Sequence, residues 1–327
     1  MIAAGKYFNP LPALYLFPRG DDFDNVRLYQ RWDESRNLYT QAWDYGSGDM
    51  SFQNPYWIMN KMINQTKKRR YMLSANLKYD VTDWLDVTGR VKVDNADMDI
   101  TEKRYAGTDT NFAGEKGMYS IIKRNDRQIY ADAIANIDLT FAGDYHLSAN
   151  VGASLKDVRM DFMGWGGDLR KIPNFFSITN ISTTNYKERE DGSHIQSQSI
   201  FANVELAWKS MLYLTVTGRN DWESALAFSK YKSFFYPSVG LSAVVSEMVD
   251  MPEWFSFLKV RGSYSAVGSS YAAYLTKPYY DYKGQTHEWD SLHRFPNENL
   301  KPEKTKSWEV GLNARFFGGK LNFDATW

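Results

Sequence analysis

The chain lacks several features that define common classes of protein. Its 327 residues include no cysteine, which excludes disulfide bonds and thiolate metal sites. It carries 39 basic and 39 acidic residues, so no net charge draws it toward nucleic acid. No stretch approaches the about 18 to 20 apolar residues of a transmembrane helix. Residues 1–20 have no basic start and their apolar pieces are broken by proline, so any export signal is expected to lie upstream.

Motifs of known chemistry are missing as well. The sequence has no HExxH, P-loop or GxGxxG pattern, and no residue stands out as part of a nucleophile–base pair. An acidic run from Asp94 to Glu102 offers the oxygen ligands that calcium prefers, but a solvated strand end is the favoured explanation. The four histidines are scattered: His146, His194, His287 and His293. The sequence therefore predicts no cofactor, no metal site and no catalytic residue.

Aromatic residues, by contrast, are abundant. They make up 16% of the chain, with 11 Trp and 22 Tyr, although the mean hydropathy is −0.53. A wet soluble protein can have this composition. So can an outer-membrane barrel, whose interior is polar and whose two rims carry aromatic girdles. Composition alone leaves both classes open.

Two neighbouring segments show the alternation of a sheet with two different faces. In residues 211–221 and again in 233–245, every second side chain is apolar, as in Leu212 and Leu214. Such a period of two means that the faces of the strand meet different environments. The opposite face, with Gly240 and Ser242, is too small and polar for the centre of a packed core. The apolar face suits either a core or lipid.

The same alternation recurs along the chain, and short and long connections follow each other in turn. Strands are expected at residues 70–79, 85–93, 128–141, 145–162, 196–208, 211–221, 233–245, 258–268, 305–316 and 320–327. Long loops are expected at residues 96–127, 163–195, 222–232 and 269–304. This order predicts an all-β fold, an antiparallel up-and-down transmembrane β-barrel with short periplasmic turns and long extracellular loops.

The alternation also assigns a direction to each side chain. Residues expected to point outward to lipid are Leu73, Leu77, Val87, Val91, Leu139, Val151, Leu206, Leu214, Leu241, Val260 and Leu312. Residues expected to line the interior are Asn76, Arg90, Asp138, Asn150, Glu205, Thr215, Ser242, Arg261 and Asn313. Arginine at a lipid-facing midplane position costs about 2–4 kcal/mol. We therefore expect Val91→Arg to impair assembly far more than Asn76→Arg.

Four segments carry a resemblance to a known family. In chain order they are NPYWIMN with RRYMLSANLKYDVTDWLDVTGRVKVD, GRNDWES with SFFYPSVGLSAVVSE, MPEWFSFLKVRGSYSAVGSS, and NENLKPEKTKSWEVGLNARFFGGKLNFDATW. Together they resemble the barrel of SusC/RagA-type TonB-dependent outer-membrane transporters. Barrels of that family have roughly 22 strands and a plugged lumen, so the chain is identified as an internal fragment with about half of them. About ten strands leave two open edges, and such a sheet is not expected to span a bilayer by itself.

The resemblance implies a division of the chain and a function. Residues 1–66 would be an extracellular loop region and residues 67–327 a partial barrel, with the plug domain and the C-terminal strands absent. The implied function is TonB-dependent uptake of oligosaccharides or peptides across the outer membrane of a Gram-negative bacterium, without enzyme activity. The implied partners are a SusD-like surface lipoprotein, the TonB–ExbB–ExbD complex, outer-membrane lipid and the substrate, with no nucleic acid.

Aromatic residues in the expected loops are candidates for substrate contact, because their flat apolar faces suit sugar rings. The candidates are Trp165, Phe175, Phe176, Tyr186, Trp222, Tyr279, Tyr280 and Trp289. Each of them also suits packing of one loop against another. Two other classes stay open on the residues alone: a soluble or surface β-rich carbohydrate-binding or adhesin module, and an outer-membrane barrel enzyme.

Overall fold

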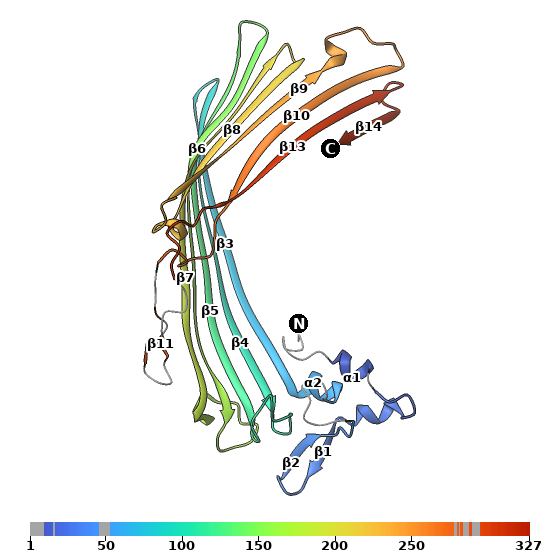
Figure 1. The fold of residues 1–327 in the computed structure, drawn as a ribbon, viewed down its shortest axis with the longest axis vertical. Coiled ribbons are helices and arrows are strands. Elements are labelled where there is room, and N and C mark those ends of the chain that lie inside the picture. The colour runs from blue at the N-terminus through green and yellow to red at the C-terminus, as the bar shows by residue number, and fades with distance from the viewer. Residues whose placement is uncertain are drawn as a thin grey trace.

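The computed structural model describes residues 10–15, 17–45, 53–277, 280, 282–283, 288–289 and 295–327. Most of these residues belong to one antiparallel sheet of ten strands (Figure 1). In chain order the strands are β3 (Met62–Thr82), β4 (Leu85–Tyr105), β5 (Gly117–Phe141), β6 (Tyr145–Leu169), β7 (Ile181–Trp208), β8 (Leu212–Glu223), β9 (Ser233–Val244), β10 (Phe255–Ser269), β13 (Glu303–Phe316) and β14 (Leu321–Thr326). Each strand pairs with its neighbours in this order, so the sheet is an up-and-down meander.

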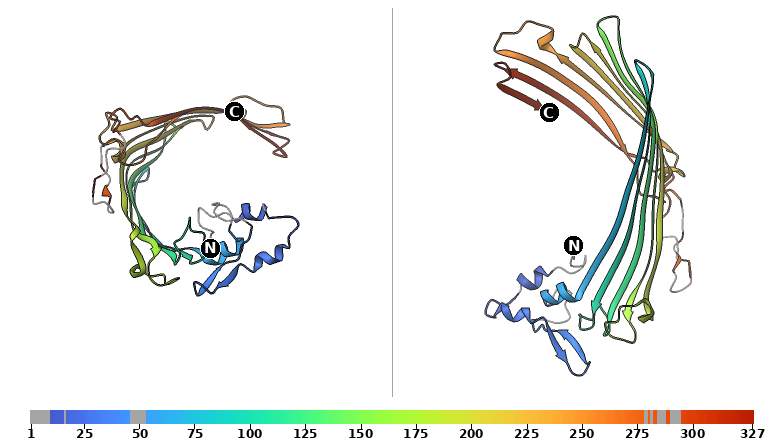
Figure 2. Two further views of the ribbon diagram at one scale, coloured as in Figure 1. Left: turned by 60° about the horizontal axis from the view of Figure 1, so that its bottom comes forward. Right: turned by 180° about the vertical axis from the view of Figure 1, so that it is seen from behind.

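The sheet is open and curved. Strands β3 and β14 form its two edges, and Figure 2 shows the other strands arranged around an arc between them. The predicted fold class, a partial antiparallel barrel of about ten strands, is confirmed. An edge strand leaves backbone N–H and C=O groups unpaired, so both edges must be paired before the sheet can cross a bilayer. Within the described residues, no helix has the length and apolar character that a membrane crossing requires.

Two of the predicted loops are largely strand. In place of a loop over residues 96–127, β4 continues to Tyr105 and β5 begins at Gly117. In place of a loop over 163–195, β6 continues to Leu169 and β7 begins at Ile181. In the same way β3 begins at Met62, before the predicted strand entry at residue 70. Residues 182–194 are polar on both faces, so they lack the alternation by which a strand is recognised. Residues 96–101 do alternate, with Ala96, Met98 and Ile100 against Asp97, Asp99 and Thr101, but their apolar side chains lie on the opposite face from those of the preceding strand.

Glycine in one of these stretches gave a misleading loop signal. Residues 164–167 read Gly-Trp-Gly-Gly, yet they pair with β5 in regular register. A Cβ atom at Gly166 would lie 2.7 Å from Oγ of Ser120, its partner on β5. Glycine therefore allows a close approach between strands here rather than a turn.

Tight turns join the strands at one end of the sheet. Ala142 and Gly143 between β5 and β6 have φ of 49° and 75°, and Lys209 and Ser210 between β7 and β8 have φ of 51° and 56°. Successive residues with positive φ match the twist of a two-stranded ribbon. The β9–β10 connection at this end contains η4 (Val245–Glu247). The predicted tight turns are confirmed, and the longer connections lie at the opposite end.

Among the described residues, the longer connections contain little regular structure. The β8–β9 loop holds η3 (Ser224–Leu226), the β6–β7 loop holds η2 (Ile178–Asn180), and the β10–β13 loop holds a small sheet of β11 (Tyr282–Lys283) and β12 (Glu288–Trp289). The β8–β9 loop and the strand β11 lie outside the arc, beside β7 (Figure 1).

The N-terminal segment packs against the long-loop end of β3 and β4 (Figure 1). It consists of α1 (Leu11–Tyr15), η1 (Phe23–Arg27), a hairpin of β1 (Gln30–Asp33) and β2 (Leu38–Gln41), and α2 (Pro55–Lys61). Asn54 caps α2, since its Oδ1 accepts from the Tyr56 N–H at 2.9 Å. Its Nδ2 donates to the carbonyls of Val26 and Ala42, both at 2.9 Å, and so ties η1 and the hairpin to the helix.

A small core forms where this segment meets the sheet. Trp57, which is fully buried, packs with Ile58 of α2 and Met62 of β3. Its Nε1 donates to Oγ1 of Thr108 in the β4–β5 loop at 3.0 Å. Apolar packing and a buried hydrogen bond therefore hold the N-terminal segment against the long-loop end of β3 and β4.

Candidate functional site on the concave face

The strand register sorts the side chains of the sheet into two faces. Directly paired residues point to the same side. One cross-strand row contains Leu77, Gly89, Ala133, Ala153 and Ile200, and the adjacent row contains Asn76, Arg90, Asp132, Ser154, Ser199 and Asp221. Every residue predicted to point outward lies on the face of the first row, and every residue predicted to point inward lies on the face of the second.

The apolar face is the convex one. The β8–β9 loop lies outside the arc, and it borders the same hollow as Ala153 and Ile200 of the apolar row. On this face an apolar belt runs between aromatic residues at the two ends, for example between Trp222 of β8 and Trp208 of β7, which pairs with Leu212 at the start of β8. A tilted strand crosses a bilayer in about 9–11 residues. The belt therefore has the height of one membrane crossing.

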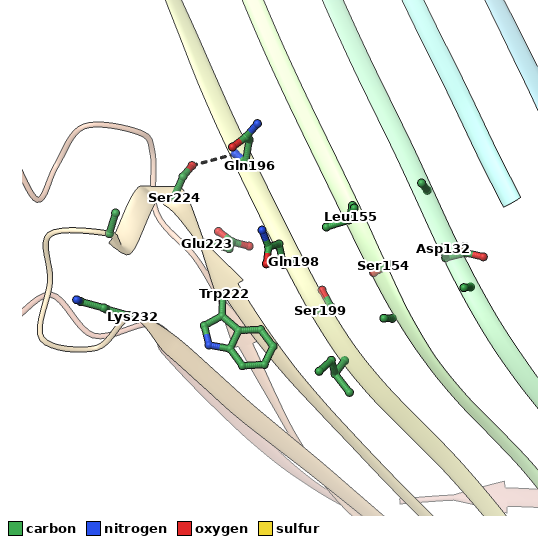
Figure 3. Close-up of a pocket in the computed structure, with 15 residues that line it drawn as sticks. Asp132, Ser154, Leu155, Gln196, Gln198, Ser199, Trp222, Glu223, Ser224 and Lys232 are labelled. Carbon is green, nitrogen blue, oxygen red and sulfur yellow. Dashed lines mark hydrogen bonds between the residues drawn. The ribbon is translucent and has the colours of Figure 1, made fainter. Parts of the chain in front are cut away.

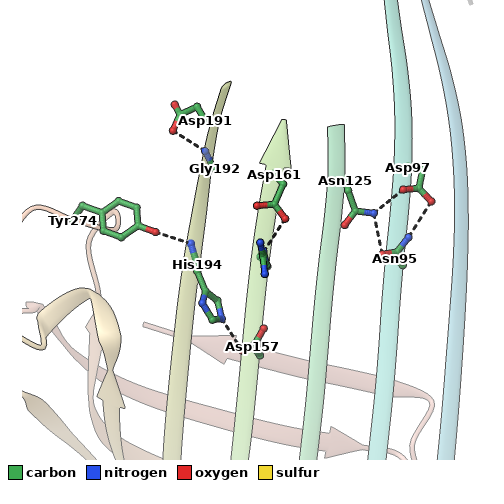
Figure 4. A network of polar contacts seen from close by, with 10 residues as sticks. Asn95, Asp97, Asn125, Asp157, Asp161, Asp191, Gly192, His194 and Tyr274 are labelled. Atoms are coloured by element: carbon green, nitrogen blue, oxygen red, sulfur yellow. Dashed lines mark hydrogen bonds and ion pairs between the residues drawn. The ribbon is translucent and has the colours of Figure 1, made fainter. Parts of the chain in front are cut away.

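Above the belt the convex face becomes charged within one or two residues. On β6 the change falls between Leu155 and Asp157. Figure 4 shows the polar contacts that follow. Nε of Arg159 donates to Asp161 at 2.8 Å, and Nδ2 of Asn125 donates to Asp97 at 2.6 Å. Unsolvated charges are too costly for hydrocarbon, so β3–β7 rise out of the membrane on the long-loop side.

Asp157 marks this boundary on β6. The Nε2 of Gln196 donates to its carboxylate at 2.6 Å, and the Nε2 of His194 lies 2.8 Å from the same oxygen. These hydrogen bonds, that of Gln196 first and that of His194 second, hold the pKa of Asp157 below its usual value. The contacts join β6 to β7 at the level where the charged surface begins.

The concave face is largely polar, and several of its charges are paired. At the level of the belt, Arg90 of β4 binds Asp132 of β5, with Nε 2.9 Å from Oδ1 and Nη2 2.9 Å from Oδ2. The Asp132 side chain is fully buried while that of Arg90 is 52% exposed. Two parallel contacts of this kind hold a guanidinium in a fixed orientation. The exposed part of Arg90 therefore faces the interior with its position set.

A second cluster of paired side chains lies on β7, β8 and β9. Nε of Arg219 donates to Asp221 at 2.7 Å and its Nη2 donates to Ser199 at 2.8 Å. The hydroxyl of Tyr236 on β9 also donates to Asp221. Such rows present donors and acceptors to the interior without a large uncompensated charge, which suits the passage of a polar solute.

A hollow of about 400 Å³ opens on the concave face just beyond the belt. Charged side chains of β3, β4 and β5 line it: Lys68, Arg70, Asp94, Arg124 and Asp126. Nε of Arg70 donates to Asp94 at 2.8 Å, and Nε of Arg124 donates to Asp126 at 2.7 Å. The Arg70 guanidinium holds the pKa of Asp94 below its usual value. Of the charged lining residues that the register directs to the concave face, three are cations and two are carboxylates, so the hollow suits a solute that carries both signs of charge.

The predicted substrate-binding aromatics do not line this hollow. Trp165 of β6 and Tyr186 of β7 form a stacked pair, with ring centroids 5.0 Å apart, on the convex side near the long-loop end of these strands. Phe176 packs edge-on against Tyr105 at 4.9 Å. Phe175 is half exposed.

Three of the four remaining candidates lie among the described residues. Trp222 stands on the convex face at the upper edge of the belt. Tyr280 is 59% exposed and Trp289 is 71% exposed on β12. Tyr279 lies outside the described residues. A substrate-binding role for this set stays a prediction.

The residues of the hollow escaped sequence reasoning for identifiable reasons. Arg124 and Asp126 fell within a segment expected to be a loop, although they alternate with Lys123 and Asn125 on a strand. The basic run 67–70 shows no alternation in sequence, and the register divides it evenly between the two faces. A signal was available, because Lys68 and Arg70 have the same parity as Asn76, which was correctly placed inside.

The acidic run 94–102 is divided in the same way. Asp94 is on the concave face beside Arg70, whereas Asp97 is on the convex face beside Asn125. Glu102 binds Arg104 on its own strand. Across the part of the chain that the structure describes, no three His, Asp or Glu side chains gather in a way that could hold a metal ion.

Comparisons with known proteins agree with this architecture. The family described as "TonB dependent receptor-like, beta-barrel" matches residues 13–327. TonB-dependent receptor P26 of Formosa agariphila is 25% identical over 304 residues, which cover 87% of this chain and 30% of that protein.

Solved structures show the same fold. The RagAB peptide importer in its open-open state aligns with a TM-score of 0.75 at 18% identity, covering 88% of this chain and 32% of that chain. The RagAB peptide transporter aligns with a TM-score of 0.72 at 17% identity, covering 87% of this chain and 32% of that chain. The chain thus spans about a third of the length of the proteins it matches. Because the family match extends over nearly all of its residues, the chain belongs to the TonB-dependent receptor-like β-barrel family.

Proposed function

We propose that the protein imports an oligosaccharide or peptide nutrient across the outer membrane of a Gram-negative bacterium, and that a peptide fits its concave face better. The hollow bordered by Lys68, Arg70, Arg124, Asp94 and Asp126 carries this proposal. A peptide brings ammonium and carboxylate groups that match a surface of both signs. A neutral glycan would bring no charge to match the excess of positive charge among these side chains. The similar RagAB structures are described as a peptide importer.

Membership of the family supports energy from the TonB–ExbB–ExbD complex, and the resemblance to SusC-type proteins supports a SusD-like lipoprotein as the surface partner. Residues 1–66 belong to the exterior in this proposal, since the N-terminal segment contacts the β4–β5 loop. Residues 67–327 form barrel wall. The apolar convex belt supports a membrane protein over a soluble module, because water would otherwise meet the whole belt. Transport proceeds without catalysis.

Uptake of a labelled acidic peptide by cells that express the protein from its own gene tests the function. Arg124→Glu reverses a charge inside the hollow, whereas Lys123→Glu reverses the next charge on the same strand but on the convex face. Loss of one charge-assisted contact is worth about 1.5–3 kcal/mol. We therefore expect uptake at low peptide concentration to fall at least about tenfold for Arg124→Glu and to stay unchanged for Lys123→Glu.

A neutral oligosaccharide of similar size serves as the second substrate. If it is taken up well and neither substitution changes its uptake, the oligosaccharide form of the proposal replaces the peptide form. Uptake of either substrate that survives disruption of the TonB complex would contradict energy-dependent import.

A further inference from the structure

The apolar belt on the convex face has a depression of about 940 Å³ over β5, β6 and β7 (Figure 3). Its floor consists of three methyl side chains, those of Ala131, Ala133 and Ala153. Larger apolar side chains stand around the floor: Leu155, Ile200 and Trp222. The carboxylate of Asp132 points away from the depression, toward β4, where Arg90 binds it. The floor is therefore low because adjacent outward positions all carry alanine.

The end of the depression nearest the long loops is polar. Gln196 and Gln198 of β7 and Lys232 of the β8–β9 loop border it. Glu223 also borders it, at a strand position that alternation directs to the concave side. This end lies at the level of Asp157, where the convex face changes from apolar to charged. Amide and ammonium donors at that level suit an anionic lipid headgroup.

The loop that overhangs this end is held in place by contacts on both sides. The backbone N–H of Gln196 donates to Oγ of Ser224 at 2.9 Å. On the other side, Oγ of Ser229 donates to the carbonyl of Leu300 at 3.0 Å. The Leu226 side chain between them is fully buried. The rim is thus formed before any ligand arrives, which lowers the entropy lost on binding.

The depression has the shape and polarity of a lipid-binding site. Water on a floor of methyl groups would lack hydrogen-bond partners, and an empty floor would lose dispersion contacts. An acyl chain needs no hydrogen-bond partner and restores the dispersion contacts. Long loops face the cell exterior in outer-membrane barrels, so the leaflet beside Lys232 is the outer one, which consists of lipopolysaccharide.

We propose that this depression binds lipid A, with one acyl chain on the alanine floor and a phosphate beside Lys232. The site faces away from the interior and is separate from the hollow that carries the transport proposal. It rests only on the placement of the family in the outer membrane, so loss of lipid binding and loss of uptake are independent results.

The test uses the protein expressed from its own gene, purified in mild detergent, stripped of lipid and titrated with lipid A while bound lipid is counted by native mass spectrometry. The double variant Ala133→Leu/Ala153→Leu fills the floor. Ala135→Leu adds one leucine side chain two residues along β5 from Ala133 on the same face, outside the depression. We expect binding to fall at least tenfold for the double variant and to stay unchanged for Ala135→Leu. Lys232→Glu should weaken binding roughly fivefold, the effect of one cation near an anionic lipid surface.

Three outcomes would overturn the proposal: equal lipid A binding by the double variant, equal loss in Ala135→Leu, or equal affinity for phosphatidylglycerol and lipid A. A second measurement does not depend on substitutions in the alanine floor. Lipid A with brominated acyl chains should quench wild-type fluorescence, and the quenched component should be missing in Trp222→Phe. The same quenching in both proteins would place the acyl chains elsewhere.

Discussion

The first five strands of the sheet and the four that follow cross the same belt but differ in length. Strands β3–β7 have 21 to 28 residues, whereas β8, β9, β10 and β13 have 12 to 15. β7 pairs with β8 only from Ser197 to Trp208, although it begins at Ile181. Bilayer thickness fixes about 9–11 residues per crossing. The extra length of the first group therefore builds a wall outside the membrane, with the concave hollow on it and the N-terminal segment at its end.

The largest effect is expected where the N-terminal segment joins this wall. Trp57→Ala removes a fully buried indole and its hydrogen bond to Thr108, at a cost of about 3–5 kcal/mol to the local packing. Hydrogen exchange should rise in α2 and in the β4–β5 loop while the sheet stays protected. Trp32→Ala on β1 is the control, since Trp32 is 50% exposed. Unchanged exchange in Trp57→Ala would mean that the wall does not hold the segment.

Two positions on one strand test whether the belt ends where the wall begins. Val151 and Met163 both lie on the convex face of β6, the first within the belt and the second above it. Arginine at the first position costs about 2–4 kcal/mol in hydrocarbon, so Val151→Arg should lower the heat-modifiable protein in outer-membrane fractions. Met163→Arg should assemble normally. Equal assembly of both variants would show that β6 is wrongly placed in depth.

A smaller difference in the free energy of unfolding is expected between an ion pair at the level of the belt and one above it. Asp132→Ala removes a fully buried carboxylate from Arg90, whereas Asp161→Ala breaks a pair whose side chains are 51% and 52% exposed. We expect losses of about 1–3 kcal/mol for the first and less than about 1 kcal/mol for the second. Urea titration of the free energy of unfolding in lipid vesicles measures both. The reverse order would contradict the burial of the Asp132 pair.

The smallest change in stability is expected for Asp157, at the boundary between the belt and the charged surface above it. Hydrogen bonds lower the pKa of Asp157 below its ordinary value, which is about 3.9. Its contribution to stability is therefore complete above that value and is lost as the pH falls through the lower folded-state pKa. Thermal unfolding should show wild type more stable than Asp157→Asn at pH 7, with the difference vanishing near pH 2. A difference that stays constant with pH would exclude the charge of Asp157 as its cause.

The comparison of the two strand groups also explains what could be predicted from sequence. Within the belt one face meets lipid and the other meets water, so Leu77 is apolar and Asn76 is polar. This alternation predicts which face each side chain occupies. Above the belt both faces meet water. Residues 182–194 are then polar on both faces, and that part of the wall resembles a loop in sequence. The number of strands and the two faces were therefore predictable, whereas the height of the wall was not.

The candidate site followed the same division. Arg90 was placed correctly inside because it alternates with Val91 and Gly89. Arg124 and Asp126 lie on the wall, where their orientation depends on pairing with β4 and β6 rather than on local pattern. Aromatic content pointed instead to Trp165, whose stacking on Tyr186 lies on the convex side.

The unbroken pairing of β5 with β6, from Met118–Asp168 to Phe141–Tyr145, limits how such a wall can change in evolution. One inserted residue in either strand would exchange its two faces beyond that point. A hairpin keeps its pattern only if each strand gains two residues together, which raises the rim by about 7 Å. Related proteins should therefore differ in wall height by whole steps of this size, with single-residue insertions and deletions confined to the connections beyond the strand ends.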